Sequence, residues 1–262
     1  MQTEKVVQHI TNWLKNYVEK SKTKGFVVGI SGGIDSAVTS TLCARTGLPT
    51  LCVELPIHQA KSQVNRAQEH IDWLMENYDN VLNEDLDLTN AFESIKASLP
   101  VAKNEDSYQL SLANTRARLR MTTLYYLAGI NGFLVCGTGN KVEDFGVGFF
   151  TKYGDGGVDL SPIADLMKSE VYAVAEYLGV VSSIQKAAPT DGLFGDSRTD
   201  EDQIGASYDE LEWAMKIVAQ GKILDDFSGR QAEVFKIYQQ RHRANLHKMI
   251  PIPVCEIPEE WK

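Results

Sequence analysis

A glycine- and serine-rich turn, GISGGIDSAV at 29–38, restricts the fold of this chain more than any other segment. The apolar run before it, GFVVGI at 25–30, is rich in β-branched residues and predicts a buried strand. The residues after it, SAVTSTLCARTG at 36–47, predict a helix. A turn between strand and helix presents backbone N–H groups at a helix N-terminus, where they and the helix dipole attract phosphate. Glycines let the backbone approach the anion closely, so the turn predicts a phosphate-binding loop.

The same order of elements continues along the chain. Further strands are expected at 49–55, 80–86 and 133–139, and helices at 59–78, 88–98 and 108–129, the last ending at Gly129. Strands that alternate with helices form a parallel sheet covered on both faces. We therefore expect an α/β fold, a Rossmann-like doubly wound parallel sheet in one domain over 1–262, with additional C-terminal helices at 208–220 and 229–245. The glycine-rich segment 137–157 is expected to be a loop.

Ligands of such sheets bind beyond the carboxyl ends of the strands. The glycine-rich turns after residues 30 and 136 both follow predicted strands, so they face one crevice if those strands are neighbours. Asp35 adds a carboxylate beside the first turn, and an acid there repels phosphate unless a metal lies between them. Mg²⁺ prefers one or two carboxylates together with phosphate oxygens and water. The alternative is that Ser31 and Ser36 cap the helix and Asp35 favours its positive end.

Composition limits the partners of the chain. Its 262 residues carry a formal net charge of -9, which repels nucleic acid and argues against a non-specific nucleic-acid binder. No apolar run is long enough to span a membrane, and 1–17 reads as an amphipathic helix and not as a signal peptide. The cysteines at 43, 52, 136 and 255 have apolar neighbours, which predicts buried thiols and a reducing, cytoplasmic compartment.

Two familiar phosphate-loop patterns do not fit the first turn. The Walker pattern requires a lysine that is missing here, and GTGNKV at 137–142 has Val142 where GxGxxG needs its third glycine. SGGIDS at 31–36 instead resembles the SGGxDS signature of the ATP pyrophosphatases, which split ATP into AMP and pyrophosphate. The segment GFFTKYGDGGVDLSPIADLMK at 148–168 is similar to the substrate loop of ammonia-dependent NAD synthetases. Weaker matches are ARLRM at 117–121, PT at 189–190 and HK at 247–248.

This resemblance implies a set of binding residues. For ATP they are Gly29, Ile30, Ser31, Gly32, Gly33, Ile34, Asp35, Ser36, Thr138, Lys168 and Thr190. For the dinucleotide substrate deamido-NAD they are Arg118, Lys152, Asp159, His247 and Lys248, the last two reaching it from the C-terminal tail. Mg²⁺ is assigned to Asp35 and Glu143. Because many relatives read GTDHAAE where this chain reads GTGNKVED, Asp144 is an adjacent alternative to Glu143.

Two assignments rest on residue chemistry beside the resemblance. Of Phe149 and Phe150, one is expected to pack in the core and the other to stack on the pyridine ring of the substrate. Asp155, in the sequence YGDGG, is the candidate to bind ammonium and help to deprotonate it. The alternative is a turn-forming Asp in an Asp-Gly pair.

The predicted reaction joins deamido-NAD, ATP and ammonia into NAD⁺, AMP and pyrophosphate through an adenylated intermediate. Only about one helix precedes the first strand, so no built-in glutaminase domain is expected. The resemblance implies a homodimer with 108–129 at its interface. The alternatives are another ATP pyrophosphatase, such as a tRNA-modifying or GMP synthetase-like enzyme, and a non-catalytic adenine-nucleotide sensor.

Overall fold

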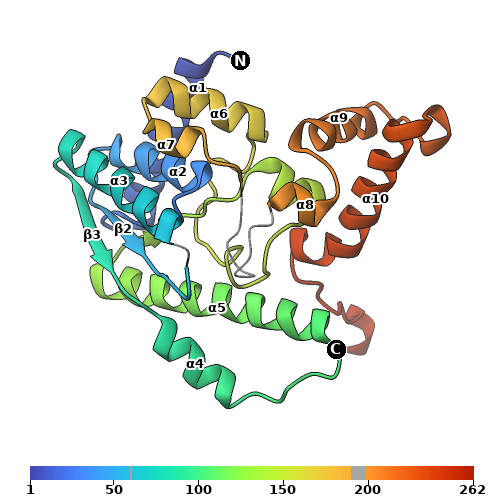
Figure 1. The fold of residues 1–262 in the computed structure, drawn as a ribbon, viewed down its shortest axis with the longest axis horizontal. Helices are drawn as coiled ribbons and strands as arrows, with labels where there is room; N and C mark the ends of the chain where they lie inside the picture. The colour runs from blue at the N-terminus through green and yellow to red at the C-terminus, as the bar shows by residue number, and fades with distance from the viewer. Residues whose placement is uncertain (60, 190–198) are drawn as a thin grey trace.

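The computed structural model describes residues 1–59, 61–189 and 199–262. Within them, the strands β1 (Phe26–Gly29), β2 (Thr50–Glu54), β3 (Val81–Asp85) and β4 (Leu134–Val135) form one parallel sheet. The strand order is β3-β2-β1-β4 (Figure 1). Phe26 of β1 is in register with Thr50 of β2 on one side and with Leu134 of β4 on the other. The predicted parallel sheet is confirmed, and β1 and β4 are neighbours, so both glycine-rich turns leave the same edge.

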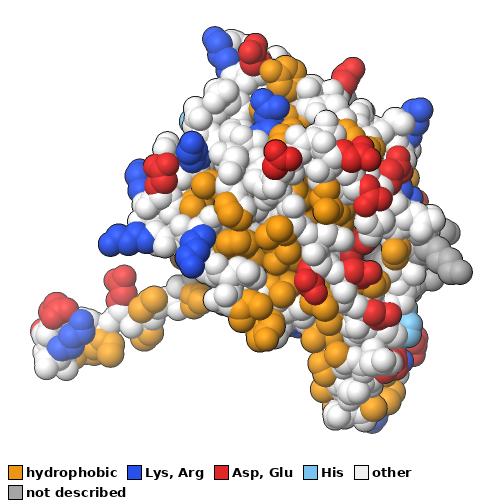
Figure 2. All heavy atoms as spheres, turned by 90° about the vertical axis from the view of Figure 1, so that its left-hand side faces the viewer, with side chains coloured by type: hydrophobic (Ala, Val, Ile, Leu, Met, Phe, Trp, Pro, Cys, Tyr) orange, Lys and Arg blue, Asp and Glu red, His pale blue; other side chains and the backbone are white. Residues whose placement is uncertain are grey.

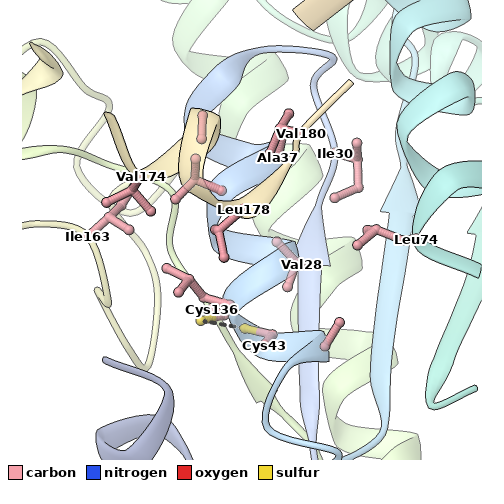
Figure 3. Packing of buried hydrophobic residues seen from close by; sticks show 14 of the residues in the cluster. Val28, Ile30, Ala37, Cys43, Leu74, Cys136, Ile163, Val174, Leu178 and Val180 are labelled. Atoms are coloured by element: carbon pink, nitrogen blue, oxygen red, sulfur yellow. Dashed lines mark hydrogen bonds between the residues drawn. The ribbon is translucent and has the colours of Figure 1, made fainter. Parts of the chain in front are cut away.

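Helices cover both faces of this sheet (Figure 1). The helices on one face are α1 (Thr3–Ser21), α2 (Ile34–Ala44), α3 (Lys61–Asn77), α6 (Lys168–Leu178) and α7 (Ser182–Gln185). The other face is covered by α5 (Glu105–Asn131), against which α4 (Thr89–Ala97) packs. Alternate residues of β1 point to the two sides of the sheet. Phe26 and Val28 join the core beneath α2, where Figure 3 shows Val28. Val27 joins the core beneath α5.

The C-terminal part of the chain builds a second core beside the sheet. Its elements are the π-helical turn η1 (Val142–Val147), α8 (Asp200–Ile204), α9 (Tyr208–Ala219), the 3₁₀ turns η2 (Leu224–Asp226) and η3 (Glu259–Trp261), and α10 (Gly229–Met249). Val142 and Val147 of η1 pack against Leu211 of α9 and Val234 of α10. This packing places η1 between the sheet and the C-terminal helices, which lie on the right of Figure 1.

Several predicted boundaries were wrong. Helix α5 continues through Gly129 and ends before Gly132, whose φ of 69° is the left-handed conformation of a helix C-cap. The segment 137–157, expected as a loop, contains η1, because apolar side chains at 142 and 147 have a core to enter. Strand β4 has only two residues, against the seven predicted for 133–139. Helix α10 reaches Met249, so His247 and Lys248 lie in its last turn and not in a tail.

Three of the four cysteines are buried as predicted, whereas Cys255 is exposed in the C-terminal segment. The Sγ atoms of Cys43 and Cys136 lie 3.5 Å apart, where α2 packs on the end of β4 (Figure 3). Among the described residues, no helix is both long enough and apolar enough to cross a membrane.

Candidate active site

The turn after β1 has the geometry of an anion-binding loop. Ser36 Oγ donates a hydrogen bond to the carbonyl oxygen of Gly33 (3.0 Å) and accepts one from the N–H of Ser31 (3.2 Å), which closes the turn on itself. Gly32 has a φ of +75°, and a Cβ there would lie 2.6 Å from the carbonyl oxygen of Gln63 in α3. In the described part of the chain, the N–H groups of Gly32 and Ile34 have no acceptor, so they are available to a ligand.

Three charged side chains from distant parts of the sequence meet beside this loop. Lys168 Nζ, at the start of α6, lies 2.6 Å from Asp35 Oδ2 and 3.0 Å from Glu143 Oε1. Asn140 Nδ2 donates to Asp35 Oδ1 (3.1 Å), and the Tyr208 hydroxyl donates to Glu143 Oε1 (2.6 Å). Lys168 is only 3% exposed, so this cluster is shielded from water on the lysine side.

Burial and charge act against each other in this cluster. Burial favours the neutral amine of Lys168, but the attraction of Asp35 and Glu143 is larger in sum and raises the pKa of Lys168. Burial raises the pKa of Asp35, opposed by the charge of Lys168 and reinforced by that of Glu143. Lys168 therefore stays protonated and serves as the counter-ion of both carboxylates.

The residues present fit a Mg²⁺ ion that also binds phosphate. Asp35 and Glu143 supply two hard oxygen ligands at the wall of one cavity. No group of three or more His, Cys, Asp or Glu side chains that could hold a metal by itself occurs in the described residues. That donor set matches the preference of Mg²⁺ for one or two carboxylates completed by substrate phosphate and water.

Asp144, the alternative to Glu143, lies in a different environment. Its carboxylate covers Gly139, where a Cβ would be 2.2 Å from Asp144 Oδ2. Burial, together with the charges of Glu143, Asp155 and Asp35, raises the pKa of Asp144 to about 8. Asp144 is not among the residues that line the cavity, whereas Glu143 is. This geometry favours Glu143 as the metal ligand.

A cavity of about 280 Å³ opens beyond the carboxyl ends of β1, β2 and β4. Its wall includes Gly29, Ile30, Ser31, Gly32, Gly33, Ile34, Asp35, Ser36, Thr138, Glu143, Phe149, Asp155 and Lys168. The structure thus brings together every residue assigned to ATP except Thr190, which lies outside the described residues, and adds Asp155 and Phe149.

Asp155 reaches the cavity from the loop that follows η1. Its Oδ1 accepts a hydrogen bond from the N–H of Thr151 (2.9 Å), which fixes the carboxylate in a tight turn. The side chain is exposed at the cavity. Loss of water around the carboxylate raises the pKa of Asp155, and the hydrogen bond from Thr151 opposes the shift. The turn-forming and the cavity-lining interpretations of Asp155 are therefore compatible.

Helix α10 holds this loop from the opposite side. Lys248 Nζ donates to the carbonyl oxygens of Gly148 and Phe150, both at 2.8 Å. Burial, together with the charge of Arg241, lowers the pKa of Lys248, while Asp155 opposes that shift. The Lys248 ammonium also lies 5.3 Å from the ring centre of Phe150, which is a cation–π contact. Lys248 thus anchors the loop to α10.

The other residues assigned to the dinucleotide lie outside the cavity wall. Arg118 Nη2 donates to the carbonyl oxygen of Lys152 (3.3 Å), and Lys152 Nζ donates to that of His247 (2.6 Å), so these three form one exposed group. Asp159 instead accepts from the N–H of Val135 (2.8 Å) and from the Tyr125 hydroxyl (3.0 Å). Asp159 therefore fastens its loop to the end of β4.

Sequence reasoning missed four polar residues of the site. Asn140 and Tyr208 hold the two carboxylates. Arg120 donates from Nε to the carbonyl oxygen of Leu55 (2.9 Å) at the cavity wall, and Glu54 ends β2 there. For Glu54 a signal existed, because a carboxylate at the end of an otherwise apolar strand is unusual. Asn140 and Tyr208 gave no signal, because their contacts cross 65 or more positions of sequence.

The fold and this cavity place the chain among the α/β nucleotide-binding proteins. A family model described as NAD synthase matches residues 6–251, and the chain belongs to this family. It is 39% identical over 214 residues to an NH(3)-dependent NAD(+) synthetase of Mesoplasma florum, covering 81% of this chain and 84% of that protein.

Two solved structures are similar over nearly the whole chain. An NMN synthetase from Francisella tularensis has a TM-score of 0.83 and 32% identity, covering 99% of both chains. An NH3-dependent NAD synthetase from Campylobacter jejuni has a TM-score of 0.78 and 26% identity, covering 98% of this chain and 100% of the other.

Proposed function

We propose that this protein is an ammonia-dependent NAD⁺ synthetase, a ligase that forms an amide from deamido-NAD and ammonia while ATP is split into AMP and pyrophosphate. The observation that carries the proposal is the meeting of the 31–36 loop, Asp35, Glu143 and Lys168 at one cavity wall. The curated relatives named NH(3)-dependent NAD(+) synthetase point to the same reaction. Neither a tRNA-modifying or GMP synthetase-like activity nor a nucleotide sensor has any support from these relatives.

In the proposed mechanism, the pyridine carboxylate attacks the α-phosphorus of ATP and pyrophosphate leaves. The N–H groups of Gly32 and Ile34 are placed to receive the phosphate oxygens of the leaving group. Lys168 brings a permanent positive charge to the same wall and exchanges a carboxylate partner for phosphate. Mg²⁺, when bound by Asp35 and Glu143, would neutralise phosphate charge. Adenylation matters because a free carboxylate has no good leaving group.

Ammonia then attacks the activated carbonyl carbon and AMP leaves. Ammonium must first lose a proton, and Asp155 is proposed to bind it and accept that proton. The proposal is supported by the position of Asp155 at the cavity wall and by its raised pKa, which brings a carboxylate closer to the range of a useful base.

The exposed group of Arg118, Lys152 and His247 is proposed to hold the dinucleotide outside the cavity, with Phe150 as the stacking candidate and Lys248 fixing its loop. Phe149 packs against the C-terminal core and also lines the cavity, and its assignment as the packing member of the pair remains part of the proposal. For Asp159 and Thr190, the proposed roles in binding substrate and ATP rest on the family resemblance alone.

One assay tests the proposed reaction. The purified protein is incubated with ATP, MgCl₂, deamido-NAD and either ammonium or glutamine, and NAD⁺ is measured with a coupled dehydrogenase. The proposal requires NAD⁺ and AMP in equal amounts with ammonium and little NAD⁺ with glutamine. ATP binding without release of pyrophosphate would refute the proposed reaction and favour the alternative of a non-catalytic nucleotide sensor.

A second substrate is favoured by one comparison. The structure with a TM-score of 0.83 belongs to an NMN synthetase, whose name indicates that it makes nicotinamide mononucleotide. The corresponding substrate would be nicotinate mononucleotide, which carries the same pyridine carboxylate without the adenylate half. Measuring kcat/KM for this acid beside deamido-NAD separates the two activities.

We also propose a homodimer in a reducing, cytoplasmic compartment. Helix α5 exposes Leu110 (54%), Tyr126 (67%) and Ile130 (63%), more apolar surface than a helix facing water normally carries. Figure 2 shows hydrophobic side chains gathered on the face that lies to the left in Figure 1. Light scattering would give the mass of a dimer for the wild type, and Tyr126→Glu would shift it towards a monomer.

A further inference from the structure

Glu54, the last residue of β2, is a buried carboxylate that the proposed reaction does not use. It is 4% exposed and lines the cavity. Among the described residues, no side chain or backbone N–H donates a hydrogen bond to its carboxylate. Its pKa is raised to about 7, first by burial and then by the negative charges of Asp85 and Asp72. Because the carboxylate lines the cavity, a ligand bound there can supply a hydrogen-bond donor.

The position of Glu54 relates it to the phosphate loop. Gly29 of β1 is in register with Val53 of β2, so Glu54 lies beside Ile30, the residue immediately before Ser31. Leu51 and Val53 pack beneath α5. Because side chains alternate along a strand, Glu54 faces the other side of the sheet, the side on which α2 begins. Neighbouring strands are about 4.8 Å apart, so Glu54 is one strand away from the loop.

A ligand group that contacts Glu54 by a hydrogen bond must be the donor, because a carboxylate only accepts. A phosphate group has no hydrogen to donate at neutral pH and is repelled by Glu54 and its acidic neighbours. If phosphates occupy the loop after β1, the part of the nucleotide that extends over β2 is the sugar. In dinucleotide-binding sheets, an acidic residue about 20 positions after the glycine-rich turn accepts a hydrogen bond from a ribose hydroxyl. Glu54 follows Gly33 by about the same interval.

We propose that Glu54 accepts hydrogen bonds from the ribose hydroxyls of ATP and makes the enzyme selective for ribonucleotides. This inference rests on the proposed function, since it requires ATP phosphates in the 31–36 loop. It makes Glu54 a specificity-determining residue that is distinct from the residues that hold the phosphates and the metal.

The test compares nucleotide binding by calorimetry with MgCl₂ and without the second substrate. The wild type is expected to bind ATP about tenfold or more tightly than 2′-deoxy-ATP or 3′-deoxy-ATP, as for loss of a hydrogen bond to a charged group. Glu54→Leu should weaken ATP binding about tenfold and abolish the preference, whereas Glu54→Gln, whose amide oxygen still accepts a hydrogen bond, should only reduce it. Asp85→Asn, an exposed change on the next strand, should retain it.

Thermal stability separates this role from a structural one. Without ligand at pH 8, Glu54→Gln should raise Tm, because it removes a charge that partial burial and the negative charges of Asp85 and Asp72 disfavour. A lowered Tm with an unchanged preference for ATP would show that Glu54 serves the fold and would overturn the assignment. Purine riboside triphosphate tests the base instead of the ribose. If Glu54→Gln loses a preference for ATP over this analogue while the preference for ATP over the deoxy nucleotides does not change, Glu54 contacts the base. That result would also overturn the assignment. If the wild type binds no ATP, the proposed function fails as well.

Discussion

Replacing Lys168 by methionine tests the buried ion cluster most directly. The lysine is 3% exposed, and its ammonium lies within 3.0 Å of carboxylate oxygens of both Asp35 and Glu143. Methionine keeps most of the volume but removes the charge, so the two carboxylates are left to repel each other. Lys168→Met should therefore destabilise the fold as well as abolish the reaction.

The magnitude follows from the burial of the pair. Removing one partner of a buried ion pair costs about 3–5 kcal/mol, because the remaining charge stays away from water. Domains of this size lose about 2–4 °C of Tm per kcal/mol, so Tm should fall by roughly 6–20 °C. Protonation of the orphaned carboxylates relieves the repulsion. The loss should therefore shrink as pH falls from 8 to 5.

Lys141 offers a matched control. Its Nζ lies 2.7 Å from Asp165 Oδ1, but Asp165 is 96% exposed, and a surface pair of this kind contributes about 0–1 kcal/mol. Urea unfolding of the wild type, Lys168→Met and Lys141→Met at pH 8 and pH 5 gives the free energies. If the two variants lose similar, small amounts at pH 8, the cluster is not a buried ion pair and the reasoning is wrong.

Three further predictions concern the loop, a buried histidine and the proposed base. Gly32→Ala should lower the free energy of unfolding by about 1–3 kcal/mol and weaken ATP binding, because its φ is +75° and the new Cβ would meet the carbonyl oxygen of Gln63 at 2.6 Å. The control Gly129→Ala, in open space within α5, should be neutral or stabilising. Equal effects of the two variants in urea unfolding would contradict this prediction. Burial lowers the pKa of His70 from 6.5 to about 4, so its contribution to the free energy of unfolding is complete above pH 6.5 and about 3 kcal/mol is lost as pH falls to 4. His70→Leu should reduce this acid-side loss of stability in urea unfolding. An unchanged loss would show that His70 is not its cause. Asp155→Asn should lower kcat with ammonium by about 10²–10⁴-fold while leaving ATP affinity unchanged; full kcat would exclude Asp155 as the base.

The sheet was predictable because local sequence patterns indicate its strands and the turn after the first strand. Phe26–Gly29 and Thr50–Glu54 are short apolar runs bounded by turns, and a buried parallel strand needs little else. The π-helical turn at Val142–Val147 was not predictable, because its surroundings are rich in glycine. Only the core formed by α9 and α10 makes a helical turn favourable there.

The site was predictable to the extent that it follows strand ends. Ser31 and Thr138 could be placed at one edge because β1 and β4 are parallel, and both line the cavity. Asp159 shows the limit of the same reasoning. Its carboxylate accepts the N–H of Val135, a contact that depends on how the loop returns to the sheet and not on any local pattern.

Three lysines that the sequence alone does not distinguish have different environments in the folded protein. Lys168 begins α6, whose packing on α2 carries its ammonium to Asp35, 133 positions earlier in the chain. Lys248 donates to two carbonyl oxygens, and Lys152 donates to the carbonyl oxygen of His247. An ammonium held by carbonyl dipoles fixes a loop, whereas one held between two carboxylates can exchange one of them for phosphate without losing its charge balance. Only Lys168 therefore has the environment of a group that responds when a nucleotide binds.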